Sequence, residues 1–386
     1  MNLAESLAYL KHKIEAISSV ELNEGKGHLD HPEDLIFLDG SAGAARALKA
    51  SVDTVKNPKT VTIKWDGYPA LIFGRDAAGR FSIMDKHMFN KKDGTGRQIF
   101  SPEQFAKYDA DRGVVRSELS NLINEIWPGL AKSSNGTKGY YWGDLLFSQP
   151  LESKNGVYSF KANPNGITYR VIADSDVGKL IGAKDAGIAV HQYLAPDALT
   201  TDDAVPLNGN IGQLKNNSNV AIVPSAMPFT PKLSLNNTEV KNVQNAISKY
   251  GAIVDQFMEN APQARNTFNQ LFTVYINKRI IAGDLNNLLG GFMDFVSTRP
   301  MTDKMKAKIV EYMQSNPEAL KGVFTIWAEL YKLKMSIVNQ LNKAAESSPV
   351  KGQLDDGTET HEGFVSNGLK FIDRMGFSRQ NLAGRT

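Results

Sequence analysis

The chain has 386 residues, of which 41% are hydrophobic and 22% are charged, with a formal net charge of +3. This is the composition of an ordinary soluble globular protein, and the small positive charge says little about partners. The absence of cysteine excludes disulfides and thiolate metal sites, which leaves carboxylates, histidines and phosphates as metal partners.

The length exceeds what one core usually covers, so we expect two domains or one large domain with an insertion. No stretch approaches the roughly 18 apolar residues of a membrane-spanning helix, so we expect no membrane partner. The first residues, MNLAESLAYLKHKIEA, predict an amphipathic helix and lack the apolar segment of a signal peptide. We therefore expect a cytoplasmic protein.

After this helix, residues 27–51 predict a turn, a short apolar segment and a helix rich in small residues. The stretch from Gly40 to Gly43 lacks the Gly-Lys-Ser/Thr of a phosphate loop, so the plain start of a helix is favoured. His28 and His31 would suit a metal site, but a capped turn is the favoured interpretation.

Three strands are expected over 60–64, 70–75 and 80–89, the last with Phe81 and Ile83 alternating with polar residues. A helix over 115–127 follows. Further strands are expected over 138–147, 157–160, 167–174 and 187–194, with a helix near 176–185 between the last two.

From about residue 236 the pattern changes to long amphipathic helices, which we expect over 238–260, 263–281, 284–297, 302–314 and 317–346. The end of the chain is again strand-like. The pattern predicts an α+β fold in which a helical domain, 236–347, is inserted between the two parts of a mixed domain, 1–235 and 348–386.

The segment KWDG places Lys64 where one predicted strand gives way to a turn. A free lysine amine has a pKa near 10.4, so a nucleophilic lysine must be pushed toward its neutral form by burial or by nearby positive charge. Asp66 would orient the amine or bind a sugar hydroxyl, and Gly67 permits a turn with close approach to a ligand.

Together with three later segments, KWDG resembles the covalent nucleotidyltransferase superfamily, which contains ATP-dependent DNA and RNA ligases and mRNA-capping guanylyltransferases. KWDG is similar to motif I, in which Lys64 would attack the α-phosphate, and YYWGDLLF is similar to motif III, in which Asp144 would contact the ribose. EGFV resembles motif IV, with Glu362 as the metal ligand, and GLKFIDR resembles motif V, with Lys370 against the α-phosphate. HPEDLI and the final DRMGFSRQN also look similar to uncharacterised ligase-like proteins of large tailed phages, which would act in the host cytoplasm.

The resemblance implies a ligase-type nucleotidyltransferase core of antiparallel sheets with flanking helices, and it implies ATP and Mg²⁺ as cofactors. A metal and a second lysine would stabilise the negative charge that develops as pyrophosphate leaves. For stacking on the base, Tyr169 is the candidate, with His191 and Tyr193 as rivals.

The sequence departs from the family pattern in several places. Ala70 stands where motif I usually continues to an arginine, so Arg75, Arg80 or Lys86 would supply that contact. Thr62 stands where the family often has an acidic residue that recognises adenine. The identity of the base therefore stays open, and with it the choice between ATP and GTP. The segment that resembles motif V has a single lysine, where the family often has two. About 16 residues follow Lys370, too few for an OB-fold domain, so we expect no C-terminal OB-fold domain.

The predicted function is a metal-dependent, ATP-using polynucleotide ligase, for RNA in preference to DNA, that passes AMP from Lys64 to a 5′-phosphate end. Lysines of the helical block would grip the strand or a protein partner, or would line a solvated surface: Lys304, Lys306, Lys308, Lys321, Lys332 and Lys334. Two alternatives stay open. In the first, the fold would serve as a non-catalytic module that binds a nucleotide or nucleic acid. In the second, the nucleotide would pass to a protein or a small metabolite.

Overall fold

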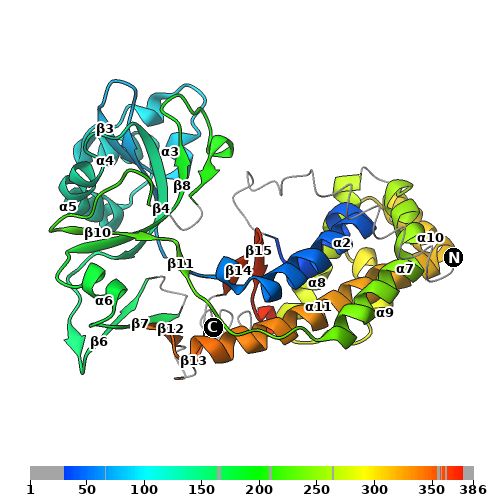
Figure 1. Cartoon of the computed structure of the whole chain (residues 1–386). Helices are drawn as coiled ribbons and strands as arrows, with labels where there is room; N and C mark the ends of the chain where they lie inside the picture. The colour runs from blue at the N-terminus through cyan, green and yellow to red at the C-terminus, as the bar shows by residue number, and fades with distance from the viewer. Residues whose placement is uncertain are drawn as a thin grey trace.

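The computed structural model describes residues 30–65, 67–162, 167–207, 211–262, 265–353, 357, 359–360 and 363–376. The fold is α+β, with a β-rich lobe on the left of Figure 1, a helical lobe on the right, and short strands between them. The predicted N-terminal helix and His28 lie outside the described residues.

The longer helices are α2 (Leu35–Lys56), α4 (Pro102–Asp111), α5 (Ser117–Ser133), α7 (Asn237–Glu259), α8 (Arg265–Ile281), α9 (Leu288–Ser297), α10 (Asp303–Ser315) and α11 (Pro317–Ala345). The shorter ones are η1 (Pro32–Asp34), η2 (Pro58–Thr60), α3 (Lys86–Phe89), η3 (Thr95–Arg97), α6 (Asp176–Ile181) and η4 (Thr201–Asp203). None of the helices among these residues combines the length and the apolar character that a bilayer-spanning segment requires.

The described strands form three sheets. Sheet A has the order β11 (Ala226–Pro228), β1 (Thr62–Lys64), β14 (Phe364–Ser366), β15 (Leu369–Phe371) and is antiparallel. Sheet B has the order β10 (Val220–Pro224), β8 (Ala186–Leu194), β4 (Gly139–Phe147), β2 (Ala70–Arg75), β3 (Phe81–Met84), with β9 (Val205–Pro206) on β8. Sheet C has the order β13 (Glu359–Thr360), β12 (Val350–Gln353), β7 (Thr168–Ile172), β6 (Val157–Lys161), β5 (Ser153–Lys154).

The helical lobe does not have a core of its own. Its buried cluster joins α7 to α11 with α2 and with inward residues of sheet A, such as Ile63 and Phe364. Ser41 of α2 donates from its backbone N–H to the Asp255 carboxylate of α7 at 2.7 Å. Residues on the two sides of the predicted boundary at 236 therefore pack together. The small side chains of α2 let this helix approach α7 closely.

Two further clusters belong to the β-rich lobe. One lies between sheet B and the helices α3 to α5. The other lies between sheets B and C and contains Trp65, Phe160 and Tyr169. The turn that follows β1 thus inserts its tryptophan into the β-rich lobe, while β1 itself packs on the helices.

Most predicted elements are present within a few residues of their expected bounds, but the strand over 80–89 ends at Met84. The Asp85 side chain accepts a hydrogen bond from Met88 N–H at 2.7 Å and caps the short helix α3, so cap chemistry ends the strand. The Gly40 stretch lies inside α2 as a kinked helix, with non-helical backbone at Asp39 and Gly40. The helix α4 and the strand β10 were not predicted from the sequence.

Candidate functional site

The strand that ends in Lys64 lies in the middle of sheet A. Lys64 pairs at the backbone with Ala226 of β11. On the other side of β1, Thr62 pairs with Val365 of β14, and Val365 pairs with Lys370 of β15. Because neighbouring strands lie about 4.8 Å apart, the backbones of β1 and β15 are about 10 Å apart. The register thus brings the segments that resemble motifs I and V into one sheet.

The turn after β1 lies against strand β4. The Tyr68 N–H donates to the Leu145 carbonyl oxygen at 3.0 Å. A Cβ at Gly67 would lie 2.3 Å from that same oxygen and 3.2 Å from the Cβ of Asp144. The predicted glycine is therefore required for this close approach, and the segments that resemble motifs I and III are in contact at Gly67 and Asp144.

Asp144 belongs to a polar and aromatic cluster on the β-rich lobe. Its Oδ1 lies 3.6 Å from Nε2 of His191, and the two side chains are 13% and 22% exposed. The His191 ring lies 5.5 Å from the ring of Trp142, and the exposed Lys86 amine lies 5.4 Å from the centre of the Trp142 ring. Of the predicted nucleotide contacts, Asp144 and Lys86 are thus joined through Trp142 and His191.

His191 is placed there by a β-bulge. Trp142 of β4 pairs with Gln192 of β8, whereas the next residue, Gly143, pairs with Val190. His191 is the extra residue, and such bulges redirect a side chain and often lie beside functional sites. Sequence periodicity could not find this bulge, since the strand 187–194 reads as regular.

Tyr169 lies in the core. Its side chain is 3% exposed, and its ring lies 4.7 Å from Trp65 and 5.6 Å from Phe160. A ring that stacks on a base must expose one face, and the structure does not show such a face for Tyr169. The apolar neighbours on sheets B and C account for its burial.

Arg75 lies at the far end of β2 from Asp144. Asp144 pairs with Ala70, five residues from Arg75, a separation of about 17 Å along a strand. The Arg75 guanidinium donates to the carbonyl oxygens of Ala131 and Ser134 at 2.8 and 3.0 Å, at the C-terminal end of α5. Arg75 therefore caps a helix in this structure and lies apart from the Asp144 side of the sheet, so its predicted contact with a nucleotide stays a prediction without support from this geometry.

Two predicted site residues, Asp66 and Glu362, lie outside the described residues. For Lys64, the structure describes the backbone alone. Within the described ranges, no group of three or more histidine and acidic side chains could hold a metal ion. The predicted magnesium ligand, Glu362, therefore stays a prediction. Its carboxylate is the ligand type that Mg²⁺ prefers.

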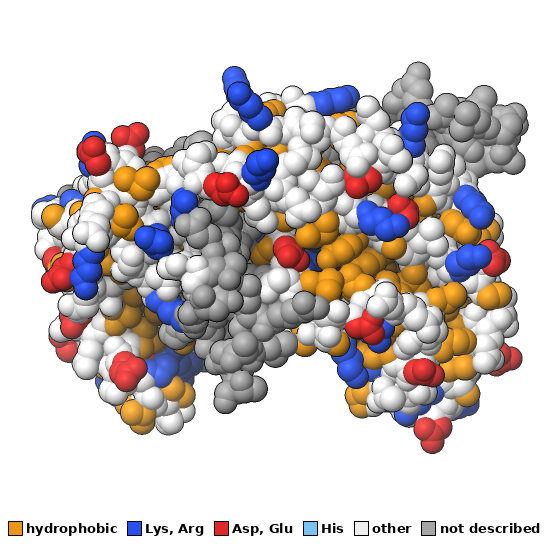
Figure 2. Space-filling view, turned by 90° about the horizontal axis from the view of Figure 1, so that it is seen from below, with side chains coloured by type: hydrophobic (Ala, Val, Ile, Leu, Met, Phe, Trp, Pro, Cys, Tyr) orange, Lys and Arg blue, Asp and Glu red, His pale blue; other side chains and the backbone are white. Residues whose placement is uncertain are grey.

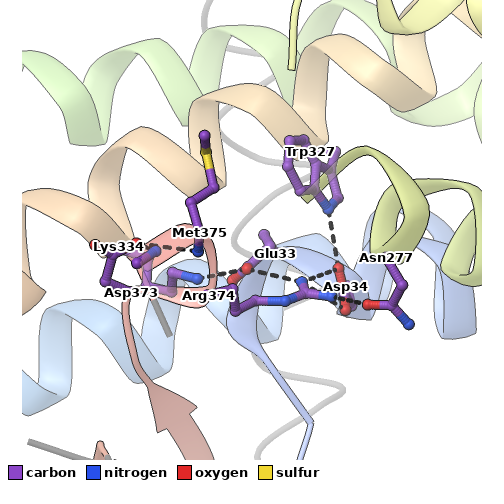
Figure 3. Close-up of polar contacts among 9 residues, drawn as sticks. Glu33, Asp34, Asn277, Trp327, Lys334, Asp373, Arg374 and Met375 are labelled. Atoms are coloured by element: carbon purple, nitrogen blue, oxygen red, sulfur yellow. Dashed lines mark hydrogen bonds and ion pairs between the residues drawn. The ribbon is translucent and has the colours of Figure 1, made fainter. Parts of the chain in front are cut away.

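The structure also contains a buried set of four charged residues that the sequence pattern did not reveal, here called the charge network: Glu33, Asp34, Lys334 and Arg374 (Figure 3). Arg374 Nη1 lies 3.0 Å from Glu33 Oε1 and 2.9 Å from Asp34 Oδ2. Lys334 Nζ lies 2.5 Å from Glu33 Oε1. Trp327 donates to Asp34 at 2.9 Å, so the network joins η1, α11 and the chain after β15.

Burial and neighbouring charges shift the titration of this network. Burial alone acts to raise the pKa of Glu33, but Lys334 and the other nearby cationic groups outweigh it and hold that pKa at about 2. Burial raises the pKa of Asp34, with Arg374 opposing the shift. Burial also lowers the pKa of Lys334, with Glu33 opposing it. Glu33 and Asp34 of HPEDLI and Arg374 of DRMGFSRQN, two segments of the resemblance, thus meet in the fold, although no periodicity pairs them.

Comparison with curated proteins and with solved structures finds no match. The model of one protein family matches residues 26–385, which include every predicted site residue and both lobes. The chain therefore belongs to DUF6267, a family of unknown function.

Proposed function

We propose that this protein is an ATP- and Mg²⁺-dependent nucleotidyltransferase that joins RNA ends through a lysyl-AMP intermediate on Lys64. The observation that carries the proposal is the convergence of segments far apart in the sequence. The strands of Lys64 and Lys370 share sheet A, and Gly67 lies on Asp144.

The proposed first step follows from the chemistry of an amine and a phosphoanhydride. The Lys64 amine, without its proton, bonds to the α-phosphorus, and the bond from that phosphorus to the bridging oxygen of the β-phosphate breaks. Pyrophosphate leaves with the electron pair, and the second amine proton passes to solvent. Lys370 offsets the negative charge on the α-phosphate, and Mg²⁺ held by Glu362 would neutralise the leaving group.

The later steps regenerate the free Lys64 amine. An oxygen of a 5′-phosphate end bonds to the phosphorus of AMP as the Lys64 nitrogen leaves and takes up a proton from solvent. A 3′-hydroxyl then bonds to the 5′-phosphorus and loses its proton to solvent, and AMP departs with the bridging oxygen and its electron pair. Lys86, exposed beside Trp142 and Asp144, is the cation best suited to contact the nucleotide or the acceptor phosphate.

Three of the six lysines named in the helical block give little support to nucleic acid binding. Lys334 is fully buried, and Lys321 and Lys332 lie 3.6 and 2.7 Å from acids of their own helix. On the face that Figure 2 shows, the helical half on the right carries blue and red side chains interspersed with orange apolar ones. A nucleic acid contact is therefore proposed at the cluster of Asp144, His191, Trp142 and Lys86 and not on these helices.

The test of the first step is incubation with α-labelled ATP and Mg²⁺, followed by denaturing electrophoresis. We expect label on the wild-type chain, none on Lys64→Ala, and full label on Lys59→Ala, the matched control at an exposed lysine five residues away. Chelation of Mg²⁺ should abolish the label. Label that persists in Lys64→Ala would remove the proposal.

The acceptor is tested with enzyme that already carries labelled AMP. We expect transfer to single-stranded RNA with a 5′-phosphate and a 3′-hydroxyl, and less transfer to nicked duplex DNA. Transfer only to protein would favour the alternative acceptor. Binding of ATP without any covalent adduct would indicate a binding module that keeps the fold without the chemistry.

A further inference from the structure

Lys370 lies in a strand that the sheet alone holds weakly. β15 has three residues and lies at the edge of sheet A, where its ladder is with β14. On its outer side, the described residues show an isolated bridge between Leu369 and Asp30, in which Lys370 N–H donates to the Asp30 carbonyl oxygen at 2.9 Å. So short a strand makes few ladder hydrogen bonds, and its position depends on how the adjoining chain is held.

The charge network holds that adjoining chain. Arg374 follows β15 by three residues, and its guanidinium binds the carboxylates of Glu33 and Asp34. Those acids follow Asp30 by three and four residues. The segment from Asp30 to Asp34 therefore makes two contacts with this part of the chain. The backbone of Asp30 binds β15, and the side chains of η1 bind Arg374.

The same group is fixed to the helical lobe. Lys334 and Trp327 of α11 donate to Glu33 and Asp34. Asn277 of α8 accepts from Arg374 Nη2 at 2.5 Å. Figure 3 shows these side chains converging on Glu33, Asp34 and Arg374 from the surrounding helices.

A buried ion network costs desolvation that its attractions only partly offset, so it is weak evidence for stability, and in some proteins such groups serve to specify one geometry. The planar guanidinium donates in fixed directions, unlike the single rotatable ammonium of lysine. Apolar side chains at these positions would bury similar area without fixing where the chain leaves β15.

We propose that the charge network is a positioning device, which anchors the edge strand β15, and through it Lys370, to the helical lobe. The helices α8 and α11, whose side chains bind the network, then support the position of Lys370 in the proposed nucleotide site. The role of Lys370 in this inference rests on the proposed function, but the anchoring of β15 is testable without it.

The anchoring is tested by backbone hydrogen exchange at residues 369–371 in the full chain. Arg374→Met removes the guanidinium, and Val323→Ala is the control, since Val323 is fully buried on α11 and outside the charge network. With each variant measured at the same interval below its own Tm, we expect Arg374→Met to speed exchange in β15 by about tenfold or more. Val323→Ala should exchange its β15 backbone hydrogens at the wild-type rate.

Equal acceleration in the two variants, or none in Arg374→Met, would overturn the inference. If Arg374→Met does not fold, Arg374→Lys takes its place, because it keeps the charge and loses the planar fork. We expect it to speed exchange in β15 by about threefold, again relative to Val323→Ala.

A second experiment asks whether Arg374 acts through Lys370. The rate of lysyl-AMP formation at saturating ATP is measured for Lys370→Ala, Arg374→Met and the double variant. If Arg374 is a positioning residue, the double variant is no slower than Lys370→Ala, whereas independent roles would multiply the two losses. A wild-type chain without any adduct would refute the proposed function, and the exchange experiment would still decide the anchoring.

Discussion

His31 shows how the surroundings of one residue decide its chemistry. Burial lowers the pKa of His31 to about 3, and although Glu33 opposes the shift, Arg374 and other cations add to it. The imidazole is therefore neutral over most of the acid range. From the sequence, His31 suited either a capped turn or a metal site, and its carbonyl accepts from Asp34 N–H at 3.0 Å in the turn that starts η1.

At His31 this shift acts to lower the stability of the protein in mild acid, while the raised pKa of Asp34 acts in the opposite direction. Between pH 6.5 and about 3 the unfolded chain binds a proton at His31 that the folded chain does not, so the free energy of unfolding falls as pH falls. The slope is at most about 1.4 kcal/mol per pH unit. Urea unfolding between pH 6.5 and 5 measures it, above the range in which Glu33 takes up its proton in the unfolded chain.

The variant His31→Gln should flatten that slope, because it removes the titrating group. His87→Gln, at an exposed histidine, controls for the loss of an imidazole elsewhere. Identical slopes for His31→Gln and the wild type would show that His31 does not carry the effect.

At the scale of elements, the turn between β1 and β2 joins the two lobes. The sequence predicted both strands and the turn, since β-branched residues flank Asp66, Gly67 and Pro69. It did not reveal that Gly67 lies against β4, because the contact involves a strand about 80 residues later in the chain. Local pattern determines the turn, and tertiary packing determines the side of Gly67 that must stay empty.

We predict that Gly67→Ala destabilises the protein by about 1–3 kcal/mol, because the added Cβ would overlap the Leu145 carbonyl oxygen. Lysyl-AMP formation should slow in parallel, as the turn moves away from Asp144. Thermal unfolding measures the first effect, and the labelling assay measures the second. Tyr68→Ala, next in the chain and 65% exposed, is the stability control, and an equal loss of stability in it would contradict the steric explanation.

Element type and extent were largely predictable where the pattern was long. The helices α7 to α11 begin and end within about four residues of their predicted bounds, since amphipathic periodicity over several turns is a strong signal. Short elements were less predictable. The four-residue helix α3 depends on the cap at Asp85. The helix α4 begins at Pro102 after the N-cap Ser101, and hydrophobic periodicity alone does not detect this start signal.

At the scale of the whole molecule, the helices and the first part of the chain share one core. Glu33 and Asp34, which precede α2, find their partners on α11 and after β15. A fragment of residues 236–347 would lack α2 and sheet A, and it would expose the apolar surface that they cover.

We therefore predict that this fragment, expressed alone, is helical but loosely packed. Near-ultraviolet circular dichroism should be weak, and thermal unfolding should be broad. A longer polypeptide that joins residues 30–57 to the fragment restores α2 and should sharpen the transition. Cooperative unfolding of the fragment alone would show that the helical block is an independent domain.

The sequence by itself determined the α+β class, the long helices, the strand and turn around Lys64, and the order of segments that resemble a nucleotidyltransferase. Those features depend on residues close together in the chain, where periodicity and turn chemistry act. Only the tertiary structure decided that β1 and β15 share a sheet, that Tyr169 is core, that Arg75 caps a helix, and that four buried charges meet. Those outcomes depend on strand pairing and burial between distant segments, and no local pattern specifies which distant partner a side chain finds.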